Sequence, residues 1–123
     1  MLNLLQGKRR AGAMVNLPNA GAANALAIFT VSTIASMVGV KTIIIRRLII
    51  RNNACGNTWV HIGTGVAGAF VHALPAFFSV NNSTDEYEED ALPGLELLAT
   101  ITAYPDVVGA GSFDVQVEVE ERG

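Results

Sequence analysis

The stretch FDVQVEVE, residues 113–120, decides the fold class of this chain. Its apolar residues alternate with polar or charged ones over eight positions. Successive side chains of a β-strand point to opposite faces, so this alternation is typical of a strand with one buried face and one wet face. The stretch therefore predicts a half-buried β-strand.

Further segments with strand signals lie upstream of this stretch. They are rich in β-branched and aromatic residues, and turns containing Gly, Pro or Asn separate them. The expected strands cover residues 25–34, 41–51, 58–62, 68–80 with a bend at Pro75, and 95–104. The polar run 81–90 is expected to be a surface loop. Without a convincing helix, the pattern predicts an all-β fold, an antiparallel β-sandwich or jelly roll of about six to eight strands.

Residues 1–23 differ from the rest of the chain. They are basic, then rich in Gly, Ala and Asn, with Pro18 as a breaker, and such a segment cannot pack a core of its own. We therefore expect a flexible, extended N-terminal arm over residues 1–23 and a sandwich domain over residues 24–123. As a hypothesis, the arm binds a partner through its larger apolar and basic side chains: Leu2, Leu4, Leu5, Lys8, Arg9, Arg10, Met14 and Leu17.

The composition favours association. Half of the residues are hydrophobic and 15% are charged, whereas about 25% charged is usual for a soluble domain. The surplus of apolar surface favours burial against copies of the chain or a partner over a plain core rich in small residues. The single cysteine, Cys55, excludes an intramolecular disulfide.

Charge is divided between the two halves of the chain. Seven of the eight Lys and Arg residues precede residue 52, and all eleven Asp and Glu residues follow residue 84. Opposite charges can pair within one fold or between neighbouring subunits, and the sequence leaves both readings open. Strong acidic segments disfavour a nucleic-acid partner, because they repel a phosphate backbone.

Motifs that suggest chemistry have simpler structural readings. The run GTGVAG at residues 63–68 matches a dinucleotide fingerprint, but Pro75 stops any helix after it, so a glycine loop is expected. His61, His72 and Cys55 match no zinc spacing, and structural roles are expected for them. The acidic run 85–90 lacks the glycine of a calcium loop and is expected to be solvated. We therefore expect no enzyme activity, no cofactor, no metal and no catalytic residue.

A membrane segment is an alternative reading. Residues 26–40 are uncharged and precede a basic stretch. They span 15 residues, short of the roughly 20 that a transmembrane helix needs. A membrane-anchored coat protein using residues 26–40 is therefore kept only as an alternative.

Residues 49–102 resemble small virion proteins of tailed phages. The shared features are an apolar strand ending in RNN at 51–53, a short strand ending in IG at 62–63, ALP at 73–75, and an acidic loop leading to LP at 92–93 and the strand 95–101. Such proteins are capsid decoration or cement proteins, often trimeric β-sandwiches that clamp neighbouring capsid subunits. The resemblance implies no catalytic residues.

The resemblance implies a structural virion protein, a decoration or cement protein that binds and stabilises a phage head. The resemblance implies the major capsid protein or other virion subunits as partners, a homo-oligomer with a trimer favoured, and a place in the virion after assembly in the host cytoplasm. A ligand-binding or glycan-binding jelly roll, with Trp59 or Tyr104 as a stacking platform, is a further alternative.

Overall fold

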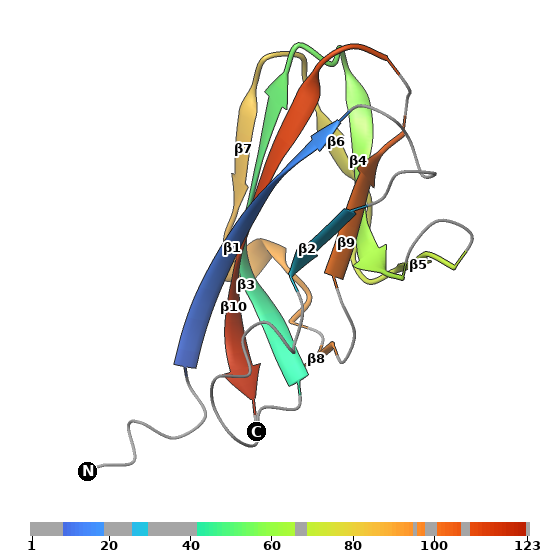
Figure 1. Cartoon of the computed structure of the whole chain (residues 1–123). Helices are drawn as coiled ribbons and strands as arrows, with labels where there is room; N and C mark the ends of the chain where they lie inside the picture. The colour runs from blue at the N-terminus through green and yellow to red at the C-terminus, as the bar shows by residue number, and fades with distance from the viewer. Residues whose placement is uncertain are drawn as a thin grey trace.

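The computed structural model describes residues 9–18, 26–29, 42–65, 69–94, 96–97, 101–106 and 109–122. These residues form ten strands (Figure 1): β1 Arg9–Pro18, β2 Leu26–Phe29, β3 Thr42–Asn53, β4 Thr58–Thr64, β5 Val71–His72, β6 Phe77–Ser79, β7 Thr84–Tyr87, β8 Glu96–Leu97, β9 Ile101–Pro105 and β10 Ser112–Arg122. The helix within this part of the chain is one short 3-10 turn, η3 Glu89–Ala91. The prediction of an all-β fold is confirmed.

The strands form two antiparallel sheets that face each other (Figure 1). Sheet A has the order β1-β10-β3-β7, with β8 also paired to β3. Sheet B has the order β2-β9-β4-β5, with β6 also paired to β4. The first strand pairs with the last, and the chain crosses between the sheets several times, which is the winding of a jelly roll.

The core lies between the two sheets and follows from the alternation in β10. Phe113, Val115, Val117 and Val119 are each 0% exposed, while the alternate residues 114, 116 and 118 are partly exposed. The strand at residues 113–120 is thus half-buried, as its pattern predicts. Facing side chains complete the core from sheet B: Val60, Ile62, Ile101 and Ala103.

The prediction of a flexible N-terminal arm is wrong for residues 9–18. Residues 9–18 form β1, which pairs with β10 along its whole length, and Leu17 is 1% exposed in the core. A strand forms here because Ala13, Val15 and Leu17 alternate with the exposed Gly12, Met14, Asn16 and Pro18 and thereby give one apolar face. The rest of the expected arm, residues 1–8 and 19–23, lies outside the described residues.

The expected surface loop at 81–90 is also wrong in part. Residues 84–87 form β7, which pairs with β3 from Leu48–Tyr87 to Arg51–Thr84. Acidic residues are tolerated in this strand because cations of β3 lie beside them. Of the expected strand at 25–34, residues 26–29 form β2, and residues 25 and 30–34 lie outside the described part.

Candidate functional site

The outer face of sheet B is built around β4. Its residues alternate, so Val60 and Ile62 are 0% exposed in the core while Trp59 is 46% exposed on the outside. His61 lies on the same outer side as Trp59, as the period of two in this strand predicts.

Aromatic partners meet these side chains from the neighbouring strands. Phe78 of β6 is paired in register with Trp59, and their rings pack edge to face with centroids 5.2 Å apart. Tyr104 of β9 is paired with His61, and their rings are stacked with centroids 4.6 Å apart. Edge-to-face and offset contacts are the arrangements that aromatic rings prefer.

Phe70 and His72 extend this surface across Gly63. The ring of Phe70 contacts His72 and Tyr104, with centroids 5.1 Å and 4.8 Å apart. Phe70 fits there because Gly63 has no side chain: a Cβ on Gly63 would lie 2.6 Å from Phe70 Cζ. We define the aromatic face by its six ring side chains: Trp59, His61, Phe70, His72, Phe78 and Tyr104.

A chain of hydrogen bonds runs along the edge of the aromatic face. Asp106 Oδ1 lies 3.1 Å from His61 Nε2, and His61 Nδ1 lies 2.9 Å from His72 Nε2. The His61 side chain is 15% exposed and that of Asp106 is 52% exposed. Asp106 is held in place by its backbone N–H, which donates to the Trp59 carbonyl at 2.9 Å.

The strands of sheet B carry no formal charge. Their sequences, LAIF, TWVHIGT, VH, FFS and ITAYP, contain no Lys, Arg, Asp or Glu. The two histidines and Tyr104 are therefore the titratable side chains within these strands, and Asp106 follows directly after β9. An exposed aromatic surface without charge has the composition of the centre of a protein–protein interface.

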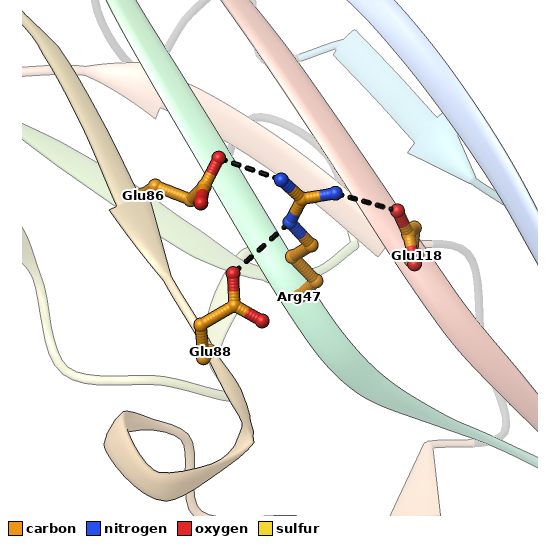
Figure 2. A network of polar contacts seen from close by, with 4 residues as sticks. All are labelled: Arg47, Glu86, Glu88 and Glu118. Carbon is orange, nitrogen blue, oxygen red and sulfur yellow. Dashed lines mark hydrogen bonds and ion pairs between the residues drawn. The ribbon is translucent and has the colours of Figure 1, made fainter.

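Sheet A has the opposite character, as Arg47 shows (Figure 2). Arg47 donates to Glu86 Oε2 at 2.6 Å and to Glu118 Oε2 at 3.0 Å. Its Nε lies 3.1 Å from Glu88 Oε2, an ion-pair distance without the alignment of a hydrogen bond. The hydrogen bonds to Glu86 and Glu118 raise the pKa of Arg47 above its usual value.

Arg46 forms a second group of ion pairs on sheet A. Its Nε lies 3.2 Å from Glu120 Oε1 and 3.5 Å from Glu89 Oε1. The basic and acidic halves of the chain thus meet inside the fold, because β3 lies between β10 and β7. Of the two readings of the charge division, pairing within one fold is confirmed for Arg46 and Arg47.

An open groove of about 490 Å³ crosses the outer face of sheet A. Met14 and Ile49 give it an apolar part, while Arg51, Glu86 and Asp114 give it a polar part. The pKa of Asp114 is held below its usual value by hydrogen bonds from Asn16 and Asn53, with a further contribution from Arg51. These polar groups already have partners, so the groove is a weaker candidate site than the aromatic face.

The residues predicted to bind a partner are spread over different environments. Leu2, Leu4, Leu5 and Lys8 lie outside the described residues. Arg9 and Arg10 lie in β1, paired in register with Glu121 and Glu120. Met14 is 67% exposed, but Leu17 is 1% exposed. Leu17 is therefore not a partner-binding residue, because its side chain is part of the core of its own subunit.

Other expectations concern metals, membranes and the cysteine. Within the described residues, no group of three His, Cys, Asp or Glu side chains is arranged to hold a metal ion. No helix in that part of the chain is long and apolar enough to cross a membrane. Burial raises the pKa of the Cys55 thiol, which opposes formation of a reactive thiolate.

The sequence indicates Trp59 and Tyr104 as candidate stacking residues but does not predict that they share one face with His61, Phe70, His72 and Phe78. Tyr104, His72 and Phe78 come from three other strands. The contact between His61 and Asp106 spans 45 positions of the sequence. A possible signal was the charge-free composition of the segments that became sheet B.

Comparisons with known proteins support the fold. No protein-family model matches the sequence, and no curated protein sequence matches it. Among solved structures, the coat protein dimer of tobacco streak virus is similar, with 12% identity, a TM-score of 0.50 and coverage of 99% of this chain and 91% of that chain.

Two other structures show weaker similarity. One is a Bacillus endospore appendage pilus protein, with 10% identity, a TM-score of 0.44 and coverage of 94% of this chain and 91% of that chain. The other is the extra small virus particle of the prawn Macrobrachium rosenbergii, with 10% identity, a TM-score of 0.40 and coverage of 97% of this chain and 82% of that chain. At these identities the comparisons concern fold alone. The chain has a jelly-roll fold similar to that of a viral coat protein.

Proposed function

We propose that this chain is a structural subunit of a virion that acts through protein–protein contacts and not as an enzyme. The observation that carries the proposal is the aromatic face. Trp59 and Phe78 are 46% and 45% exposed there, on a sheet whose strands carry no formal charge. Exposed Trp and Phe side chains become the main contributors to binding when a partner excludes water from them.

The partner best suited to the aromatic face is another copy of the chain. The strands of sheet B carry no formal charge and Asp106 lies at the edge of the face, so two copies can meet without like charges at the centre of the contact. A charged partner would lose hydration at that centre without gaining an ion pair. We therefore propose a homo-oligomer formed through sheet B. A trimer is favoured by the resemblance to phage decoration proteins.

The finer proposal is a decoration or cement protein of a tailed-phage head. The major capsid protein or other virion subunits are its proposed partners, and the virion, assembled in the host cytoplasm, is its proposed location. The exposed Met14 and the N-terminal residues Leu2, Leu4, Leu5, Lys8, Arg9 and Arg10 are proposed to contact them. Jelly rolls occur in viral capsid proteins, which is consistent with this role.

Co-sedimentation with capsids tests the virion role. Purified chain is added to particles that lack it, and bound chain is measured after gradient sedimentation, with chain alone as the control. Saturable binding with a fixed ratio of copies to capsid subunits is expected. Met14→Ser is expected to lower the affinity. Absence of binding to capsids, together with a monomeric mass, would contradict the proposal.

Glycan binding is a second candidate function, favoured by the exposed ring of Trp59. Aromatic rings that project from a sheet are suited to stacking on sugar rings. Tyr104 is less suited than the sequence suggests, because the ring of His61 is stacked on it. Calorimetric titration with a set of glycans separates the classes: heat that disappears in Trp59→Ser would favour this function over assembly.

A further inference from the structure

The chain Asp106–His61–His72 contains both histidines of the protein and lies within the aromatic face. We propose that it is a proton-responsive switch that controls self-association through that face. This inference rests on the proposed function, because it concerns the regulation of the same surface. Imidazole is the side chain that ordinarily changes charge between about pH 5 and pH 8.

Hydrogen-bond chemistry fixes the tautomers of the neutral pair. The Asp106 carboxylate can only accept, so His61 Nε2, 3.1 Å away, must carry a proton. In neutral His61 the other nitrogen, Nδ1, is then an acceptor. His72 Nε2, 2.9 Å from that nitrogen, must therefore be the donor. The neutral pair is thus held by two hydrogen bonds that run in one direction, from His72 through His61 to Asp106.

One added proton is accommodated without breaking either hydrogen bond. It can bind His72 Nδ1, which neither bond uses, or be shared along the chain so that His61 donates to both neighbours. The positive charge is then balanced by the Asp106 carboxylate. At this stage the site has no net charge, and its geometry is preserved.

A second proton cannot be accommodated in the same geometry. With both imidazoles protonated, His61 Nδ1 and His72 Nε2 would each carry a proton, and the two N–H groups would face each other at 2.9 Å. Two positive rings would also repel. Asp106 and Tyr104 are the other titratable groups placed against the pair by β9 and the residue after it, and only Asp106 can supply a negative charge in this pH range.

The consequence is a change in the aromatic face itself. His72 must turn away from His61, and its ring contact with Phe70 is lost with it. The face then carries a net positive charge that each copy would have to bury against the next. Burial of an unpaired charge is unfavourable, so the second proton weakens association.

The size of the effect follows from the linkage between proton binding and association. If one proton must be released before two copies associate, the association constant falls about tenfold for each unit by which the pH is lowered, in the acidic limit. Asp106 lies at the edge of the aromatic face and its side chain is 52% exposed, so its own charge need not be buried on association. Self-association should therefore weaken where the second proton binds, on the acidic side of the range from pH 8 to pH 5.

The variant His72→Gln tests the switch. The Gln side-chain amide can donate to His61 Nδ1 as His72 Nε2 does, but it cannot take a second proton. Because the chain has no other histidine, this variant retains a single imidazole. Sedimentation velocity from pH 5 to pH 8 is expected to show pH-dependent association for the natural chain and nearly constant association for His72→Gln. Equal pH dependence of association in the natural chain and in His72→Gln would overturn the switch.

Sedimentation velocity distinguishes failure of the switch from failure of the proposed function. A chain that is monomeric at every pH would contradict self-association and, with it, the control of association. A stable oligomer whose mass does not change between pH 5 and pH 8 would leave the proposed function standing and overturn the switch.

Discussion

At the scale of single residues, the aromatic face depends on a position without a side chain. Gly63 lies between β5 and β9, paired with His72 on one side and Thr102 on the other. The absence of a Cβ lets Phe70 and the backbone of Val71 approach closely. Glycine usually weakens a strand because it loses more conformational entropy on folding. Here the close packing around Gly63 requires it.

Gly63→Ala is expected to destabilise the fold by about 1–3 kcal/mol or more, because the new Cβ would overlap the Val71 carbonyl oxygen. Gly12→Ala is the matched control in β1, where the nearest atom to a Cβ is Val117 O at 3.4 Å. Urea denaturation measures both. Equal stability of the two variants would contradict the close packing at Gly63.

Arg47 shows how one cation can hold several acids. In Arg47→Met, Glu86, Glu88 and Glu118 lose their shared counter-charge, so the melting temperature at neutral pH should fall. The loss should shrink at high salt, since these side chains are partly exposed and salt screens the repulsion. Arg51→Met, whose exposed side chain donates to Thr84, is the control and should melt close to the natural chain. A larger loss for Arg51→Met would contradict this assignment.

At the scale of strands, the carboxylate of Asp114 in β10 links its own strand to both neighbours in sheet A, β1 and β3. Its Oδ1 accepts from Asn16 of β1 at 2.8 Å and its Oδ2 accepts from Asn53 of β3 at 3.0 Å. These hydrogen bonds favour the ionised form, which is why the pKa is lowered from 3.8. The same contacts help to fix the register of β1 and β3 on β10.

The sign of the resulting pH dependence follows from the lowered pKa. The stabilisation from Asp114 is present above its unfolded-state pKa, near 3.8, and is lost as the pH falls through the lower folded-state value. Asp114→Asn removes this ionisation. Urea denaturation at pH 7 and below pH 3 should therefore show a larger loss of stability for the natural chain than for the variant. Parallel losses would contradict the role of Asp114.

Deletion of N-terminal residues tests the place of β1. Removing residues 1–20 deletes β1 and the buried Leu17, whose loss alone is worth about 2–5 kcal/mol, so the domain should be strongly destabilised. Removing residues 1–8 deletes none of the described core and should leave the melting temperature nearly unchanged. Equal melting of both deletion variants would show that β1 does not contribute to the fold.

How far the sequence predicts these strands depends on the signal in each of them. The alternation in β10 is unambiguous because large apolar and charged residues alternate. The alternation in β1 is present in Ala13, Val15 and Leu17, but small residues and Pro18 make it resemble a flexible segment. The acidic β7 was missed because its Glu86 is paired with Arg47, which lies far away in the sequence.

At the scale of the whole molecule, the jelly roll separates two kinds of surface. Sheet A carries the described arginine ion pairs, while the strands of sheet B carry the aromatic face and no formal charge. The sequence could not predict this division, because it arises from the order in which distant strands pair. Hydrophobic composition did predict that some surface should be covered, but not which one.

Copies of the chain are proposed to associate through the aromatic face. Trp59→Ser removes its largest exposed side chain, and Met14→Ser removes an exposed apolar side chain from sheet A. A central aromatic residue of an interface contributes about 2 kcal/mol or more, roughly a 30-fold change in Kd. Met14→Ser should leave self-association unchanged.

Sedimentation equilibrium at micromolar concentration and pH 8 decides between these surfaces most directly. An oligomeric mass is expected for the natural chain and for Met14→Ser, and a shift towards the monomer for Trp59→Ser. A monomeric natural chain, or an oligomer that Met14→Ser dissociates and Trp59→Ser does not, would contradict association through the aromatic face.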